Sequence, residues 1–105
     1  MQTYLVRRPG VAANANELDA AFVRLRAFEE RQHDVAARWL RSDVLHEADG
    51  RLGLLCRFQA DGVASLRRHA ELSGLPAGEI TPVIGRVVFR EEPFGPPAAP
   101  AAASG

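Results

Sequence analysis

Residues 52–83 constrain the fold most, because a strand, a helix and a second strand follow one another there without a long loop. Apolar side chains alternate over 52–59, which predicts a strand. They recur at helical spacing over 62–73, and Gly74 suits the left-handed position that ends a helix. Residues 79–89 are rich in β-branched side chains and predict another strand. This part of the chain therefore has the order strand–helix–strand.

The boundaries of this unit carry their own signals. Asp61 is expected to cap the helix, since its carboxylate can accept from the first backbone N–H groups. Val63, Leu66 and Ala70 share one side of that helix and form its expected buried stripe. Gly85 predicts a bulge or bend in the last strand.

The first half repeats the same order. Residues 3–8 predict a strand that stops at a Pro-Gly pair. Asn16 is the expected N-cap of a helix over 17–32, whose apolar residues recur at helical spacing. A second strand is expected within 35–47, and the Asp-Gly pair after it predicts a hairpin into the strand at 52–59.

The complete order is β-α-β-β-α-β, which is the split β-α-β arrangement of ferredoxin-like domains. We expect one α+β domain over residues 1–90 and a flexible Pro/Ala-rich tail over 91–105. Both helices would cover one face of a four-stranded antiparallel sheet. The other face is expected to carry Leu40, Val44 and Leu55, and an exposed apolar sheet normally finds a partner. We therefore expect a homodimer with the two sheets face to face, a dimeric α+β barrel enclosing a small cavity.

Composition excludes several classes of protein. Acidic and basic residues balance at 13 each, so no strong field attracts nucleic acid or an anionic membrane. The single cysteine excludes an internal disulfide and a cysteine-rich zinc site. No apolar run approaches the roughly 18–20 residues of a membrane span. The first residues are charged too early for a signal peptide, so a cytoplasmic location is expected.

The same central segment resembles a known bacterial family. In that family a cysteine-containing strand leads to a capped helix that ends in a His-Ala-x-x-x-Gly-x-Pro-like turn, and an Ile/Val-Thr-x-Val strand follows. The matching positions here are Cys56, Asp61, His69, Ala70, Gly74, Pro76 and Ile80-Thr81-Pro82-Val83. Trp39-Leu40-Arg41-Ser42 also looks like the family's second strand. The chain is thus similar, over about residues 3–88, to the family catalogued as domain of unknown function 4242.

This resemblance implies a dimeric ferredoxin-like fold. Some members are described as nickel-binding, with ligands that include histidines near the end of the first strand. This chain has Arg7 and Arg8 at that place. Two guanidiniums cannot ligate a cation and would repel it, which argues against a metal at that position.

Two histidines are the candidate metal ligands. His69 is expected on a half-exposed flank of the second helix, where it either hydrogen-bonds a neighbour or faces a cleft as a ligand or general base. His46 is expected on the strand face that meets the partner subunit. No His-x-x-(x)-His spacing is present, which makes the metal signal weak.

A second set of residues could line a ligand cavity. Trp39, Arg41 and Asp43 alternate on the second strand, and an arginine between an aromatic ring and a carboxylate could bind a small anion or form a structural ion pair. Tyr4 and Cys56 are the other candidate cavity residues. Cys56 is expected mainly as a small buried hydrophobe, because no histidine is clearly placed to activate it.

Two functions remain open from the sequence. The first is a small homodimeric binding protein whose cavity holds a divalent metal ion such as nickel or a small molecule. The alternative is a cofactor-free enzyme of the isomerase, cyclase or monooxygenase type that uses a His/Asp/Arg set in the cavity, which rests on fold analogy alone. Neither catalytic nor cofactor-binding residues are assigned.

Overall fold

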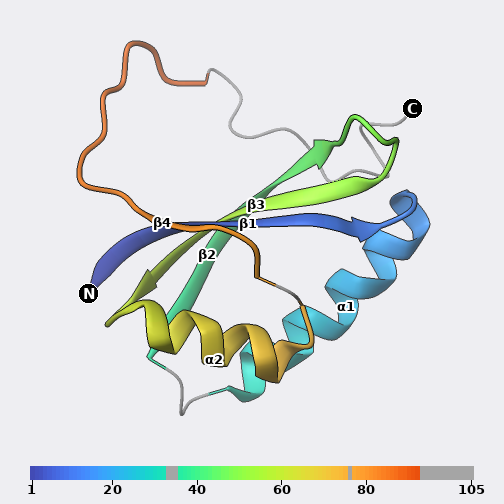
Figure 1. The fold of residues 1–105 in the computed structure, drawn as a ribbon, viewed down its shortest axis with the longest axis horizontal. Coiled ribbons are helices and arrows are strands. Elements are labelled where there is room, and N and C mark those ends of the chain that lie inside the picture. Colours follow the sequence, from blue (N-terminus) through green and yellow to red (C-terminus); the bar gives the residue numbers. More distant parts are fainter. Residues whose placement is uncertain (33–35, 76, 93–105) are drawn as a thin grey trace.

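The protein is a small α+β structure, seen in a computed structural model that describes residues 1–32, 36–75 and 77–92 (Figure 1). Its elements follow the predicted order. They are β1 (Gln2–Ala12), α1 (Ala15–Arg31), β2 (Ala37–His46), β3 (Leu52–Ala60), α2 (Val63–Ser73) and β4 (Ile80–Pro82).

The four strands form one antiparallel sheet in the order β2-β3-β1-β4. Figure 1 shows both helices on the same side of this sheet. The opposite side, here called the open face, has no helix over it among the described residues. The prediction of a single sheet with two helices on one face is therefore confirmed.

The first strand is longer than expected, because the Pro-Gly pair makes an irregularity rather than a stop. β1 continues to Ala12, and its pairing with β3 shifts register between Arg8 and Ala12. Gly10 lies inside that shift with φ of +63°, in the left-handed region that glycine tolerates best. The extra residues are accommodated as a bulge, so pairing resumes beyond it.

Helix boundaries differ from the expectation in two places. The N-cap of α1 is Asn14 rather than Asn16, and its Oδ1 accepts from the backbone N–H of Glu17 at 3.0 Å. α2 begins after Gly62 without a side-chain cap, and Asp61 instead accepts from the Ser65 hydroxyl. The C-terminal end is as predicted, since Gly74 adopts φ of +75°.

The last strand is much shorter than the predicted 79–89. β4 pairs with β1 only through Ile80, Thr81 and Pro82. One more backbone bond, from Val83 N–H to the Thr3 carbonyl at 2.9 Å, extends the alignment. Residues 84–92 then leave the sheet as irregular chain. Most of the expected tail, residues 93–105, lies outside the described residues.

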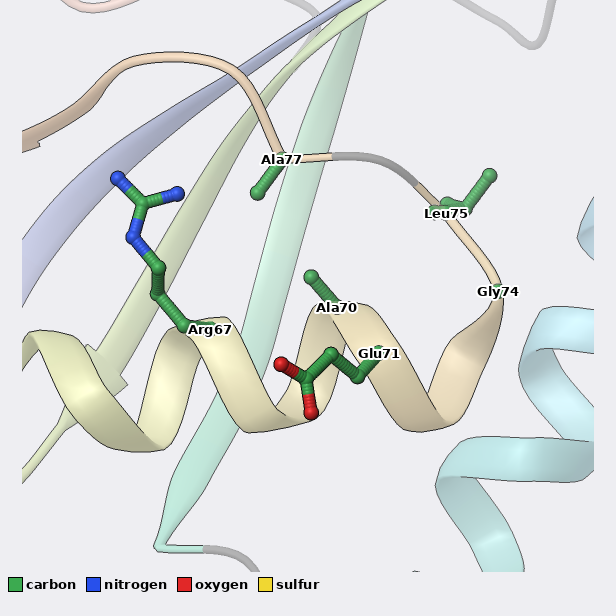
Figure 2. Close-up of a pocket in the computed structure, with 6 residues that line it drawn as sticks. All are labelled: Arg67, Ala70, Glu71, Gly74, Leu75 and Ala77. Atoms are coloured by element: carbon green, nitrogen blue, oxygen red, sulfur yellow. The ribbon is translucent and has the colours of Figure 1, made fainter.

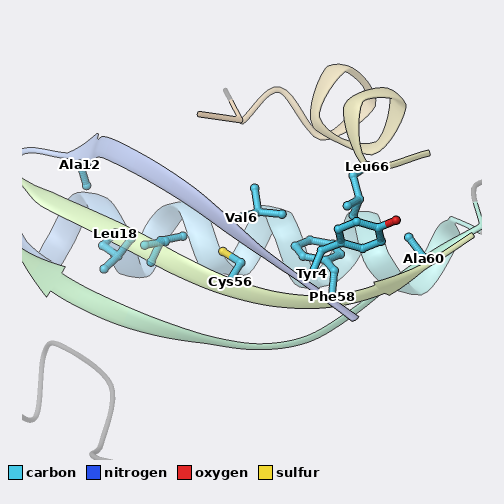
Figure 3. Close-up of a cluster of buried hydrophobic side chains, with 9 residues drawn as sticks. Tyr4, Val6, Ala12, Leu18, Cys56, Phe58, Ala60 and Leu66 are labelled. Carbon is cyan, nitrogen blue, oxygen red and sulfur yellow. The ribbon is translucent and has the colours of Figure 1, made fainter. Parts of the chain in front are cut away.

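The hydrophobic core fills the space between the sheet and the helices (Figure 3). Strands β1 and β3 supply most of it through alternate residues, and each helix adds a leucine. The core cluster comprises Tyr4, Val6, Ala12, Leu18, Leu54, Cys56, Phe58, Ala60 and Leu66. Within the described residues, no helix is long and apolar enough to cross a membrane.

A second irregularity decides which residues of β2 face the core. The pairing of β2 with β3 shifts between Trp39 and Arg41, which leaves Leu40 unpaired. Directly paired residues of neighbouring strands point to the same face. Trp39 therefore faces the helices with Phe58, while Arg41 points to the open face.

This bulge corrects two expectations about β2. Trp39 does not share a face with Arg41 and Asp43, because the extra residue reverses the alternation after it. Val44 pairs with Leu54 and packs against the core, so it does not lie on the open face. Leu55, by contrast, alternates with the core residues Leu54 and Cys56 and does point to the open face.

Candidate functional site

Arg8 is the most unusual side chain in the structure, because it is charged and only 1% exposed. Tyr4, Val6 and Arg8 are every second residue of β1, so they point to the same face. The Arg8 side chain therefore lies in the layer between sheet and helices. Its Nη1 donates to the Leu75 carbonyl at 3.1 Å. Its Nε is buried and has no hydrogen-bond partner in the part of the chain that is described.

The Arg8 guanidinium packs against two aromatic rings rather than against a carboxylate of the described residues. The guanidinium carbon lies 5.4 Å from the centroid of Trp39 and 5.7 Å from that of Phe58. Burial lowers the pKa of Arg8, because the charged form loses its hydration, and the proximity of Cys56 and Glu29 opposes this effect. The guanidinium nonetheless stays charged, as arginine does in proteins. The core thus holds a cation that donates to the Leu75 carbonyl, lies beside the Cys56 thiol and forms no ion pair with any described residue.

His69 is the second buried polar side chain, with an exposure of 0%. Its Nε2 is hydrogen-bonded to Oε1 of Glu29 on α1, and its Nδ1 is buried without a partner among the described residues. The ring packs edge-on against Phe28, Phe58 and Trp39, at centroid distances of 5.3, 5.0 and 5.9 Å.

The half-exposed position expected for His69 is therefore wrong. The buried side of α2 is formed by Leu66 and His69, and Val63 is 42% exposed. Compared with the expectation, α2 is rotated about its axis, so that the His69 imidazole faces the interior. There it can hydrogen-bond to the Glu29 carboxylate. This position supports a structural role for His69, which links α2 to α1 through its hydrogen bond with Glu29.

Cys56 forms a short polar chain with residues of β2. Trp39 Nε1 donates to Ser42 Oγ at 2.8 Å, and the Ser42 hydroxyl donates to Cys56 Sγ at 3.0 Å. Burial raises the pKa of the Cys56 thiol, and the Ser42 hydrogen bond and the Arg8 charge offset this only in part. At neutral pH Cys56 is a protonated, buried thiol, as the sequence interpretation expects.

This raised pKa predicts a loss of stability in alkali. The unfolded chain releases the thiol proton near the ordinary cysteine pKa of about 8.5, while the folded chain retains it. The free energy of unfolding should therefore fall as pH rises above about 8.5, by up to about 1.4 kcal/mol per pH unit, until the folded-state pKa is reached. Urea unfolding of wild type and Cys56→Ala between pH 7 and 10 measures this. An equal decline in both proteins would show that other groups cause it.

The open face carries a different polar group. Arg41 on β2 lies directly opposite Arg57 on β3, and neither has an ion-pair or hydrogen-bond partner within the described residues. Asp43 is next along β2 on the same face, opposite Leu55. Like charges at opposed positions repel each other. An anion bound between the two guanidiniums would relieve this repulsion.

One end of the open face is already neutralised. Arg7 Nη2 lies 3.1 Å from Oε2 of Glu47, an ion pair that joins β1 to the β2–β3 hairpin. The Glu47 carboxylate sits over Gly53, where an added Cβ would lie 2.1 Å from its Oε1. Gly53 therefore leaves the space in which this pair forms. Arg7 is consequently satisfied, in contrast to Arg41 and Arg57.

The two candidate metal ligands are far apart. His46 ends β2 on an exposed position, whereas His69 contacts Trp39 near the start of that strand. His46 lies seven positions after Trp39, which corresponds to roughly 20 Å of strand. Among the described residues, no three His, Cys, Asp or Glu side chains gather in a way that could hold a metal ion. The third histidine, His33, lies outside the described residues.

The five candidate cavity residues are divided between the two faces. Tyr4, Trp39 and Cys56 belong to the helix-covered side, and Arg41 and Asp43 belong to the open face. Neither His46 nor His69 shares the open face with Arg41, because Val44 and His46 alternate with Leu45 on β2. A His/Asp/Arg set on that face is therefore not formed by these residues.

A shallow pocket of about 410 Å³ lies beside the C-terminal half of α2 (Figure 2). Arg67 and Glu71 supply its charged side chains, and residues of the turn after the helix complete it. The Leu75 carbonyl that accepts from Arg8 belongs to the same turn. The opposite charges on its wall give this pocket no clear ligand preference.

Sequence reasoning missed that Arg8 is buried and that the half-buried Glu29 binds His69. The sequence does contain a signal for the burial of Arg8, because Arg8 follows Tyr4 and Val6 at intervals of two residues and so lies on the same face of the first strand. The charge of Arg8 and the proline that follows it both favour the interpretation that Arg8 lies on the surface. Glu29 carries no such signal, because its role depends on how α1 meets α2.

Comparison with known proteins agrees with the fold and adds no function. No protein-family model matches the chain, and no curated protein does. The crystal structure of SCO4226 from Streptomyces coelicolor A3(2) is similar, with a TM-score of 0.60 and 19% sequence identity. The match covers 81% of this chain and 99% of that one. At this identity the likeness shows the fold alone.

Proposed function

We propose that this chain is a ferredoxin-like domain that works as a small cytoplasmic homodimeric binding protein, related to domain-of-unknown-function family 4242. Two copies pack through their open faces and enclose a small anionic ligand between them. The observation that carries the proposal is the opposed pair of Arg41 and Arg57, which has no ion-pair partner among residues 1–32, 36–75 and 77–92 and lies on the sheet face opposite the helices.

The apolar part of the open face supports the dimer. Leu5, Leu45 and Leu55 are partly exposed there, and Leu40 at the bulge is 47% exposed. Leu5 pairs with Arg57, and Leu55 pairs with Asp43, so leucines and charges alternate across neighbouring strands. A second sheet would remove the leucines from water.

The charges of this face favour an anion over a metal ion. Guanidinium groups bind carboxylate and phosphate oxygens in two-point contacts. A twofold axis through the interface would bring the Arg41–Arg57 pairs of both copies to one cavity. A divalent cation such as nickel would meet these four arginines, with Asp43 of each copy as the nearby carboxylate on the described part of the face.

Thermal unfolding with added ions tests this assignment. Citrate or inorganic phosphate at about tenfold excess over its dissociation constant should raise the Tm by several degrees. Arg41→Gln and Arg57→Gln should each remove most of that rise. Arg24→Gln, an exposed arginine on α1, is the matched control and should keep it.

Nickel chloride, added in a separate titration, distinguishes the metal alternative. A saturable Tm increase with nickel, together with no response to either anion, would overturn the anion assignment in favour of a metal. An anion effect equal in wild type and Arg57→Gln would also overturn it, because the stabilisation would then arise elsewhere.

A further inference from the structure

The segment after β4 carries large apolar side chains that are exposed to water. Val83 is still bonded to the Thr3 carbonyl at 2.9 Å. Beyond it, Ile84 is 96% exposed, Val87 78% and Phe89 95%, and Val88 is also exposed. Isolated exposed apolar residues are ordinary, but here four of the six residues from Ile84 to Phe89 are large and apolar, interrupted only by Gly85 and Arg86.

The direction of this segment matters as much as its composition. Figure 1 shows residues 83–92 extending from β4 away from the helices, on the side of the open face. The segment does not bury the leucines of its own sheet, since Leu5 and Leu55 on the two central strands stay partly exposed and Ile84 and Phe89 are almost fully exposed. Two uncovered apolar surfaces, one on the sheet and one on the segment, therefore border the same space.

We propose that residues 83–92 form an arm that packs against a second copy of this chain and closes the margin of the dimer. The inference rests on the proposed homodimer and adds the segment that holds it. A second copy seated on the open face would lie where the arm already extends. By twofold symmetry each copy would receive the arm of the other, so both sets of apolar side chains are buried together.

The arm's attachment makes it suited to this role. The bonds from Gly78 to Val83 along β1, including Arg7 N–H to the Glu79 carbonyl at 2.9 Å, fix its starting point at the sheet edge. A contact made by a chain segment of fixed origin loses less freedom on association than one made by a free tail. Burial of Ile84 and Phe89 would then contribute directly to dimer affinity.

Sedimentation equilibrium of three chain lengths tests the arm. The full chain and a chain ending at residue 92 should have similar dimer dissociation constants. A chain ending at Val83 should dissociate at least 100-fold more readily. Equal dissociation constants for all three would overturn the arm and leave the face-to-face dimer standing, whereas a monomeric full chain at micromolar concentration would overturn both.

A full-length variant guards against effects of truncation. Ile84→Asp/Phe89→Asp should weaken the dimer as strongly as the truncation does, and Val23→Asp, 73% exposed on α1, should not. Circular dichroism confirms that each variant is folded. If Ile84→Asp/Phe89→Asp lowered the stability of the dilute monomer without changing dimer affinity, the arm would pack on its own chain and the proposal would be wrong.

Discussion

Replacing His69 with alanine is expected to lower the free energy of unfolding by about 3 kcal/mol. The ring is fully buried and packs edge-on against three aromatic rings, so its removal leaves a cavity in a close-packed layer. Glu29 also loses its buried partner. Urea denaturation measures the effect as a lower midpoint with an unchanged m-value.

Arg68→Ala is the matched control for this change. Arg68 precedes His69 on α2 and is exposed, so its replacement should alter stability by no more than about 0.5 kcal/mol. Glu29→Gln should fall between the two, because the amide can still accept from His69 Nε2 and only the charge is lost. A His69→Ala effect as small as that of Arg68→Ala would contradict the bridging role.

Arg8 should respond differently to alanine and to methionine. Arg8→Ala is expected to cost about 3 kcal/mol, because the side chain fills space against Trp39 and Phe58. Arg8→Met keeps that apolar length, favours contact with aromatic rings and removes a buried charge that has no ion-pair partner among the described residues. Its stability should lie within about 1 kcal/mol of wild type, or above it.

The same urea titration, run on both variants, separates packing from charge. A large loss for alanine with little loss for methionine identifies packing as the contribution of Arg8. An equally large loss for both would mean that the guanidinium itself stabilises the fold. That result would contradict the account of Arg8 as a cation that no ion pair within the described residues compensates.

Local patterns were sufficient to predict most of the fold. Alternation and helical spacing give the order of the six elements, and Gly74 marks the end of α2. The two bulges were not predictable, because Gly10 and Leu40 are placed by pairing with β3 rather than by their neighbours in sequence. Since one extra residue reverses a strand's faces, the bulge at Leu40 was enough to separate Trp39 from Arg41.

The candidate site was predicted less well, for a related reason. Cys56 was correctly interpreted as buried, since it lies between apolar residues on a regular strand. His69 was not, because the rotation of α2 depends on Glu29, which comes from a helix 40 positions earlier. Single-strand alternation likewise says nothing about which residue lies opposite, so the Arg41–Arg57 pair emerges only from the register.

The homodimer is the central claim, and the mass of the untagged chain in solution tests it most directly. Multi-angle light scattering at micromolar concentration should give about twice the chain mass of 11.4 kDa. Leu55→Asp, which places a charge on the open face, should return the mass to that of one chain, while Val23→Asp on α1 should not. A wild-type mass of one chain under these conditions would contradict the dimer and the enclosed ligand site that depends on it.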